Sequence, residues 1–396
     1  MSRLEEGLRA ELDRLRQQDL YRCLLTIQSP QAEIVEVGGR RLVNFCSNNY
    51  LGLANRSELR EAAVRATELW GVGAGASRLV SGDMGPHREL ERAIAEFEGT
   101  EDALLFPTGY MANLGTIAAL VGPGDEVILD KLCHASIIDG ARLSGARIRT
   151  YRHCDMNHLR ELLVERKGRR VLVVTDGVFS VDGDIAPLRD LYELTREFDA
   201  VLMLDDAHGT GVIGEQGRGV AELCDLGGRI DVLVGTLSKA VGALGGFVAG
   251  TSGLTDYLRN SARSFIYTTA LPPAICAAAR EGLRLIGAEP DLRRRLWDNV
   301  RSLVAGMSRI QEAKGETGER QRAVSAIVPI AIGDSGRAVR IADRLMDAGF
   351  LVRALRPPTV PHGTSRLRVT LMATHTKDQI GALVEWLRAA ADQCAK

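Results

Sequence analysis

Short apolar runs alternate with stretches of helical periodicity through the middle of the chain, from about residue 88 to 285. Most runs are rich in aliphatic and β-branched residues, as is typical of strands that are buried on both faces. The runs are Ala103–Phe106, Glu126–Asp130, Arg147–Tyr151, Val171–Thr175, Val201–Leu204, Val232–Val234 and Gly246–Ala249. This repeat predicts an α/β fold with a mostly parallel central sheet that is covered by helices on both faces.

The start of the chain has a different pattern. Four leucines recur at helical spacing and predict an amphipathic helix over residues 3–19; they are Leu4, Leu8, Leu12 and Leu15. Residues 42–53 then predict a short strand that leads into a turn.

The pattern changes again beyond Pro290 and predicts a small α+β domain. Its expected elements are a long charged helix (292–313), a strand near Ala326–Ala331, a helix through Ala338–Ala348, strands near Leu351–Leu355 and Leu367–Leu371, and a last helix. A single core rarely grows beyond about 250–300 residues. We therefore expect an N-terminal helix and arm (1–45), a large cofactor-binding α/β domain (46–288) and a small C-terminal domain (289–396).

Composition excludes several classes of partner. The formal net charge is −1, from 50 Lys+Arg and 51 Asp+Glu, so no overall field attracts nucleic acid or anionic lipid. The 7 cysteines are odd in number and lack CxxC spacing, which argues against a disulfide framework or a thiolate zinc site. No apolar run approaches the ~20 residues of a membrane span, and no secretory signal is evident. We expect a cytoplasmic protein.

Two polar segments follow predicted strands and carry the most informative chemistry. Asp205-Asp206-Ala207-His208 closes one apolar run, and Gly235-Thr236-Leu237-Ser238-Lys239 closes the next. Open α/β sheets bind ligands at the carboxyl ends of their strands. A carboxylate there can hold a pyridine nitrogen protonated, and an amine can form a Schiff base with an aldehyde. The two segments therefore predict a pyridoxal phosphate site.

Each of these residues also has a structural interpretation. Asp205 is placed where aspartate often caps a helix, His208 could be a hydrogen-bonded core histidine, and Lys239 could be a solvated lysine. The spacing favours the functional interpretation, because the acid and the histidine can reach opposite atoms of one ring.

Further residues could complete such a site. Gly109 and Tyr110 follow an apolar strand and open a helix, whose N-terminus suits a phosphate. Ser180 and Thr236 offer hydroxyls toward the same edge. His134 follows the strand ending at Asp130, where its ring could lie flat on a pyridine ring or act as an acid, although a structural role is equally compatible.

One other group of residues suggests a metal. His153, Cys154, Asp155 and His158 lie close together in the sequence, but no second cluster supports them. We interpret them as a surface loop and predict no metal site.

The segments that bear these residues resemble the α-oxoamine synthases, which are pyridoxal phosphate enzymes of fold type I. The resemblance runs from about residue 20 to 390 through collinear motifs. The motifs are Asn44–Leu53, Ala76–Gly82, Thr175–Asp184, Asp205–Gly219 and Gly235–Ala240. Members of this family condense an amino acid with an acyl thioester and release carbon dioxide.

The resemblance implies a role for each candidate residue. Lys239 would bond the cofactor aldehyde, Asp205 would pair with the pyridine nitrogen, His208 would bind the ring oxygen, and His134 would stack over the ring. Gly109, Tyr110, Ser180 and Thr236 would contact the cofactor or its phosphate. Thr268 and Thr269 would reach the phosphate of a neighbouring subunit, which implies a homodimer. Arg22 and Thr359 match substrate-contacting positions, and Arg368 matches the arginine that binds the amino acid carboxylate.

The resemblance also narrows the substrates. Asp205–Gly219 and Arg356–Pro361 are most similar to the biotin-pathway branch, which joins L-alanine to a pimeloyl thioester carried by coenzyme A or a carrier protein. Asn44–Asn55 and Ser136–Arg142 are almost as similar to the branch that joins glycine to acetyl-CoA. A catalytically silent cofactor-binding scaffold is a third alternative, which the presence of Lys239 disfavours.

Overall fold

The computed structural model describes residues 2–313 and 323–393. Its contacts divide the chain into two compact units. The larger unit comprises Asn49–Ser180 and Asp184–Arg295, and the smaller unit comprises the residues up to Asn48, Val181–Gly183 and those from Leu296 onward. The structure thus groups the N-terminal arm with the C-terminal residues, while the three functional domains expected from the sequence stay a prediction.

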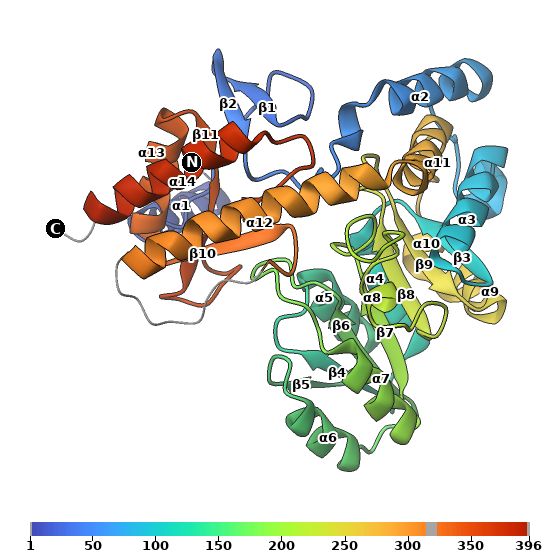
Figure 1. Ribbon diagram of the computed structural model, residues 1–396. Coiled ribbons are helices and arrows are strands. Elements are labelled where there is room, and N and C mark those ends of the chain that lie inside the picture. Colours follow the sequence, from blue (N-terminus) through green and yellow to red (C-terminus); the bar gives the residue numbers. More distant parts are fainter. Residues whose placement is uncertain (1, 314–322, 394–396) are drawn as a thin grey trace. The chain divides into compact units, whose positions relative to one another are not determined.

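The larger unit is built on a seven-stranded sheet in the order β3-β9-β8-β7-β6-β4-β5 (Figure 1). The strands are β3 (Asp102–Phe106), β4 (Glu126–Asp130), β5 (Arg147–Tyr151), β6 (Val171–Asp176), β7 (Val201–Asp205), β8 (Val232–Thr236) and β9 (Gly246–Gly250). β9 runs antiparallel to both of its neighbours, and the other neighbouring pairs are parallel. The predicted mostly parallel sheet is confirmed, and each predicted run lies within two residues of an observed strand.

Helices surround this sheet. They are α2 (Ser57–Trp70), α3 (Gly85–Glu98), α4 (Gly109–Leu120), α5 (Ala135–Ser144), α6 (Met156–Val164), α7 (Leu188–Glu197), α8 (Val220–Leu223), α9 (Ser252–Ser261), α10 (Arg263–Ile266) and α11 (Pro273–Ala288), with a 3₁₀ turn at Leu53–Asn55 and a π turn at Arg78–Gly82. α4 contacts β3, β8 and β9 and packs on α5, α9 and α10, whereas α7 contacts β7.

The strand sequences explain why the sheet needs helices on both faces. Alternate residues such as Leu172 and Val174 of β6 join one core cluster with Ile117 of α4 and Ile137 of α5. The residue between them, Val173, points to the opposite face and is also fully buried. Because both faces are apolar, helices must cover each of them.

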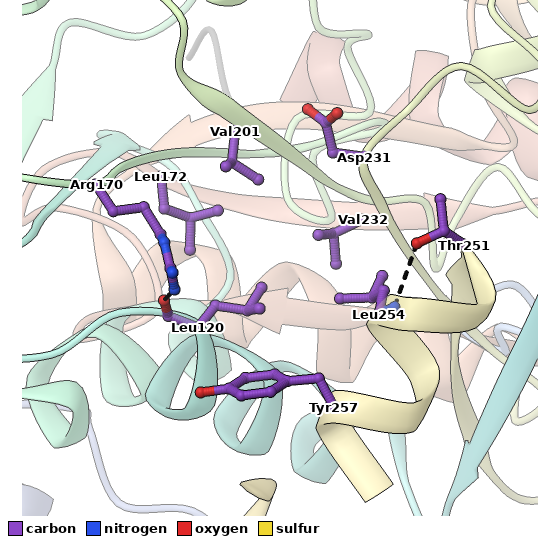
Figure 2. A pocket seen from close by; sticks show the side chains of 9 residues that line it. All are labelled: Leu120, Arg170, Leu172, Val201, Asp231, Val232, Thr251, Leu254 and Tyr257. Carbon is purple, nitrogen blue, oxygen red and sulfur yellow. Dashed lines mark hydrogen bonds between the residues drawn. The ribbon is translucent and has the colours of Figure 1, made fainter.

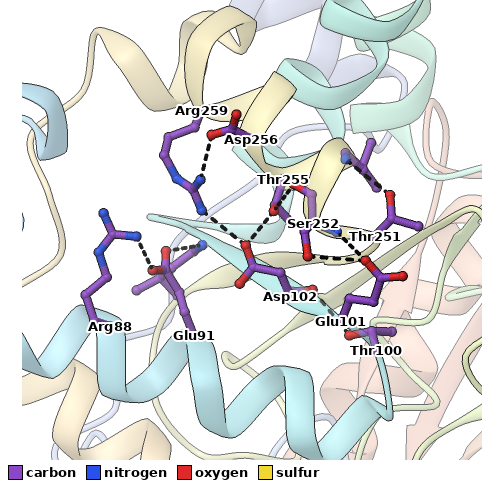
Figure 3. A network of polar contacts seen from close by, with 12 residues as sticks. Arg88, Glu91, Thr100, Glu101, Asp102, Thr251, Ser252, Thr255, Asp256 and Arg259 are labelled. Carbon is purple, nitrogen blue, oxygen red and sulfur yellow. Dashed lines mark hydrogen bonds and ion pairs between the residues drawn. The ribbon is translucent and has the colours of Figure 1, made fainter.

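β3 lies at one edge of the sheet and is tied to the helix that follows β9. Asp102, the first residue of β3, accepts hydrogen bonds from the Thr255 hydroxyl (2.5 Å) and from Arg259 (3.3 Å), both on α9 (Figure 3). The neighbouring Glu101 accepts bonds from the Ser252 amide and hydroxyl at the start of α9. These contacts anchor the edge strand whose far end leads into α4.

The smaller unit contains two three-stranded sheets and four helices. β1 (Ile34–Val37) and β2 (Arg40–Asn44) join β11 (Phe350–Leu351), while β10 (Ile327–Gly333) and β12 (Arg353–Leu355) flank β13 (Ser365–Thr370). The helices are α1 (Arg3–Gln17), α13 (Ser335–Asp347), α14 (Lys377–Gln393) and the part of α12 (Pro290–Ala313) from Leu296 onward; its first turns belong to the larger unit. The single strand expected at Leu351–Leu355 is therefore two strands, because its halves pair with different sheets.

The N-terminal helix expected at residues 3–19 is present as α1. None of its residues is buried, and Leu4 and Leu8 are 72% and 56% exposed. In the described part of the chain, no helix combines the length and the apolar character that a membrane crossing requires.

Candidate active site

Three neighbouring strands of the larger unit end in polar residues at the same edge. Asp176, the last residue of β6, is the register partner of Asp205, the last residue of β7. Asp205 is in turn opposite Val234 of β8, which ends two residues later at Thr236. The parallel strands thus bring two carboxyl groups and a hydroxyl to the carboxyl-end edge, where α/β sheets bind ligands.

Lys239 and His208 are hydrogen-bonded to each other at this edge. Lys239 Nζ lies 2.8 Å from His208 Nε2, and the other ring nitrogen, Nδ1, lies 2.7 Å from the hydroxyl of Tyr50. Tyr50 is buried, so its ring and hydroxyl have a fixed position. A protonated amine at Lys239 donates to Nε2, which leaves the histidine proton on Nδ1, facing the Tyr50 oxygen.

A second chain of hydrogen bonds links Asp205 to His134. Asn113 on α4 donates from Nδ2 to Asp205 (2.6 Å) and to the Ser136 hydroxyl (2.9 Å). The Ser136 hydroxyl lies 2.7 Å from Nδ1 of His134. The Ala207 amide donates to the other oxygen of Asp205. These contacts fix the carboxylate and the orientation of the imidazole together.

The acids at this edge are crowded. Burial raises the pKa of Asp176 well above its usual value, and the charge of the neighbouring Asp205 raises it further. Asp176 also accepts the His134 amide at 2.9 Å. Although one side of His134 is open to solvent, partial removal from water lowers its pKa, and Lys239 acts in the same direction. The crowding at this edge therefore disfavours a negative charge on Asp176.

The N-terminus of α4 lies beside the end of β8. The Thr108 hydroxyl caps the helix by accepting the Met111 amide at 3.1 Å. A Cβ on Gly109 would stand 3.5 Å from the Thr236 side chain, and a Cβ on Gly246 would come within 2.5 Å of the Gly109 nitrogen. Glycine at 246 is therefore required for this close approach. The first amides of the helix and the Thr236 hydroxyl form a cradle suited to an anion.

Ser180 comes from the loop after β6, and Tyr110 is in the first turn of α4. Ser180 follows β6 by four residues and is partly exposed. Tyr110 is 45% exposed, and its hydroxyl donates to Asp139 at 2.5 Å. Thr268 lines a water-sized cavity near Phe106 at the end of β3, and Thr269 is exposed. A second subunit would be needed to test the role expected of these two threonines.

Of the expected substrate residues, His134 lies in the larger unit, and the other three lie in the smaller unit. Arg368 is on β13 and donates to the Asn48 side chain at 3.0 Å. Arg22 donates to the Pro357 carbonyl at 3.1 Å, so it contacts the turn that carries the exposed Thr359. Their roles stay predictions.

Sequence reasoning missed Tyr50, Asn113, Ser136 and Asp176 as members of the site. Tyr50 lies in the motif Asn44–Leu53 and Asn113 is four residues after Gly109, but their partners are 158 and 92 residues away along the chain. Asp176 could have been found, because it closes a predicted strand in the same way as Asp205.

The group at the carboxyl-end edge meets the chemical needs of the predicted cofactor. It supplies an amine at Lys239, a buried carboxylate at Asp205 held by two donors, a ring nitrogen at His208, and an anion cradle at Gly109. A pyridine nitrogen, an aldehyde, a ring oxygen and a phosphate would each find a matching group.

A larger cavity of about 370 Å³ lies elsewhere, at the amino ends of the same strands (Figure 2). Leu172, Val201 and Val232 line it from the sheet, together with residues of α9. Its polar groups already have partners: the Tyr257 hydroxyl donates to a backbone carbonyl, and Asp231 accepts bonds from Arg196 and the Leu202 amide. Four residues of strand separate Val232 from Thr236, about 13 Å. We therefore place the chemistry at the opposite end.

Comparison with known proteins identifies the family. The sequence model of the family described as aminotransferase class I and II matches residues 40–387. The chain belongs to this family. Two curated relatives are the 8-amino-7-oxononanoate synthases of Methylococcus capsulatus, 50% identical over 96% of this chain and 97% of the relative, and of Geobacter sulfurreducens, 50% identical over 95% and 96%.

Solved structures confirm the fold type I architecture and the resemblance to α-oxoamine synthases. Serine palmitoyltransferase from S. paucimobilis, described with a bound PLP–myriocin aldimine, matches with a TM-score of 0.92 at 34% identity over 99% of both chains. The 8-amino-7-oxononanoate synthase of Francisella tularensis matches with a TM-score of 0.76 at 30% identity over 90% of this chain and 99% of that one.

Proposed function

We propose that this chain condenses L-alanine with a pimeloyl thioester to give 8-amino-7-oxononanoate, carbon dioxide and a free thiol, a step in biotin biosynthesis. The observation that carries the proposal is the 50% identity, across 96% of the chain, to an 8-amino-7-oxononanoate synthase. The identity to serine palmitoyltransferase is 34%. The difference supports the amino acid and acyl chain of the first relative over those of the second.

The cofactor is pyridoxal phosphate, which supplies an electron sink for charge that develops at the Cα atom of the amino acid. Lys239 would hold the cofactor through its aldehyde, and its amine would be the group placed to move the Cα proton. Asp205 holds a proton at the pyridine nitrogen, and its hydrogen bonds from Asn113 and the Ala207 amide keep it in place.

The remaining residues bind and orient. His208 would bind the ring oxygen through Nε2, and the contact between Nδ1 and the Tyr50 hydroxyl orients the imidazole. The α4 amides and Thr236 bind the phosphate, Ser180 contacts the cofactor, and His134 stacks over the ring. Arg368 binds the carboxylate of alanine through paired N–H donors, which orients the Cα substituents. Arg22 and Thr359 contact the acyl substrate.

A homodimer is part of the proposal, with Thr268 and Thr269 reaching the phosphate held by the partner subunit. Mixing a Lys239→Ala chain with a Thr269→Ala chain would test it, because a mixed dimer would contain one site with neither substitution. Recovered activity supports the shared site, and an additive loss contradicts it. A cytoplasmic location stays a prediction, in keeping with the unpaired cysteines of the described residues.

Thiol release by the cofactor-loaded protein tests the reaction. L-alanine, glycine and L-serine would each be offered with pimeloyl-CoA, acetyl-CoA and palmitoyl-CoA, and a carrier-protein thioester would follow. The proposal predicts turnover with L-alanine and pimeloyl-CoA well above every other pair. Preference for glycine with acetyl-CoA would move the chain to the second branch considered above. Absence of thiol release in a protein whose lysine bonds the cofactor would mean that the acyl carrier or the substrate class is wrong, whereas absence of that bond would support the silent scaffold.

A further inference from the structure

His153 joins two carboxylates of the larger unit, one at the end of β4 and the other in the loop after β6. It lies in the turn after β5, with Nδ1 3.0 Å from Asp130 Oδ1 and Nε2 2.7 Å from Asp184 Oδ2. Ionised carboxylates only accept hydrogen bonds, so both ring nitrogens must donate, and the ring is an imidazolium. Burial by itself would lower the pKa of His153, but the hydrogen bonds to Asp130 and Asp184 outweigh it and raise the pKa to about 12.

Asp130 organises the turn that carries His134. Its Oδ1 also accepts the Leu132 amide at 2.8 Å, and its main-chain carbonyl accepts the Cys133 amide at 3.1 Å. The side chain of Asp130 is 2% exposed, so its orientation is fixed by these partners. His134, which follows Cys133, is the residue expected to stack over the cofactor ring.

Asp184 closes the loop that carries Ser180. The Phe179 amide donates to the Asp184 carbonyl at 2.9 Å, and Val178 forms an isolated bridge with Ile185. The Phe179 ring is buried and stands edge-on to the His153 ring, with centroids 4.4 Å apart and an angle of 87°. His153 thus contacts this loop at the carboxylate and at the ring that precedes Ser180.

A metal site is the alternative for the same atoms. Ligand atoms of Asp130, His153 and Cys154 lie within 4.8 Å of one another. A metal needs a ring nitrogen with a free lone pair, whereas both nitrogens of His153 face carboxylates. The Cys154 sulfur is 3.7 Å from each nitrogen, so it does not lie along the lone-pair direction of either. The geometry favours the ionic bridge.

We propose that His153 is a positioning residue whose imidazolium bridges Asp130 and Asp184 and so holds the His134 turn and the Ser180 loop at the spacing the cofactor requires. This inference rests on the proposed function, because it concerns how the same site is kept in shape. It assigns His153 no contact with the substrate or the cofactor.

The test compares His153→Gln with the matched control His158→Gln. His158 is five residues away on α6, where Nδ1 accepts the Arg152 amide at 2.9 Å. For each protein the dissociation constant of pyridoxal phosphate is measured by titration of the apoprotein, together with the visible circular dichroism of the bound cofactor and the thermal midpoint of the apoprotein. We expect His153→Gln to raise the dissociation constant of the cofactor about tenfold, which corresponds to about 1.4 kcal/mol. The visible dichroism of the bound cofactor should also be reduced. His158→Gln should change neither by more than about twofold.

Asp184→Asn keeps the test decisive if His153→Gln does not fold, because it leaves the buried Asp130 contact in place. It should also weaken cofactor binding, and the two substitutions together should cost less than the sum of their separate effects. Unchanged affinity and dichroism in a folded His153→Gln or Asp184→Asn protein would overturn the inference. Tight binding of one Zn²⁺ that Cys154→Ser abolishes would also overturn it. If the wild-type protein itself does not bind the cofactor, the proposed function fails instead.

Discussion

The two ends of strands β6, β7 and β8 carry different kinds of polar chemistry. At the carboxyl ends, Asp176 and Asp205 stand side by side, and Lys239 is hydrogen-bonded to His208. At the amino ends, the larger cavity is lined by apolar side chains, and Asp231 has backbone and arginine partners. Crowded acids destabilise a fold, so their presence indicates function more reliably than the size of a cavity does.

Replacing Lys239 by alanine should have the largest effect on activity. Without the amine, no residue at the edge can bond the aldehyde or move the Cα proton, so we expect thiol release to fall at least about a thousandfold. The half-buried side chain should contribute no more than about 1 kcal/mol to the free energy of unfolding. Lys131→Ala, an exposed lysine just after β4, is the control and should keep full activity. Turnover by Lys239→Ala within tenfold of wild type would refute the assignment.

Asp205→Asn should separate activity from stability. The amide keeps the shape of the carboxylate but cannot stabilise a protonated pyridine nitrogen, so kcat should fall about a hundredfold or more. Because the charge of Asp205 helps to raise the pKa of Asp176, the free energy of unfolding of the apoprotein at neutral pH should be unchanged or higher. Kinetic assays and chemical denaturation would measure both quantities. A large loss of stability with little loss of kcat would indicate a structural role.

Asp206→Asn should change how stability depends on pH. Burial is the main reason that the pKa of Asp206 is raised to about 7, and the charge of Asp205 adds to it. The pKa of Asp206 in the folded state is above the unfolded value of about 3.9, so its contribution to the free energy of unfolding is greatest at low pH. This contribution falls as pH rises toward 7, by at most about 4 kcal/mol. Asparagine does not ionise, so the free energy of unfolding of the variant should lack this fall with pH. Its side-chain oxygen can still accept the Val220 amide, which preserves the local structure. Denaturation from pH 4 to 8 measures it, and identical slopes would contradict the raised pKa.

Tyr257→Phe in the amino-end cavity should have the smallest effect. It removes one hydrogen bond, to the Ala119 carbonyl at 3.0 Å, from a side chain that is half exposed. We expect a loss of about 0.5 kcal/mol in the free energy of unfolding and a kcat within about twofold of wild type. A tenfold loss of kcat would mean that the two strand ends are not functionally separate.

The sequence predicted the sheet well because each strand that is buried on both faces is apolar throughout and ends in polar residues. The same rule located Asp205, His208 and Lys239, although their roles stay predictions. It could not find Tyr50 or Asn113, whose contacts join segments 158 and 92 residues apart. It also treated His153 as surface-loop chemistry, because only the folded chain brings Asp130 and Asp184 to opposite sides of one ring.

The most direct test of the account is to find which lysine bonds the cofactor. The chain has six, Lys131, Lys167, Lys239, Lys314, Lys377 and Lys396. Pyridoxal phosphate would be bound to the protein, the lysine–cofactor bond reduced with borohydride, and the labelled peptide identified by mass spectrometry. The account predicts a single label, on Lys239. A label on another lysine, or spread evenly over several, would contradict the placement of the active site at the carboxyl ends of these strands.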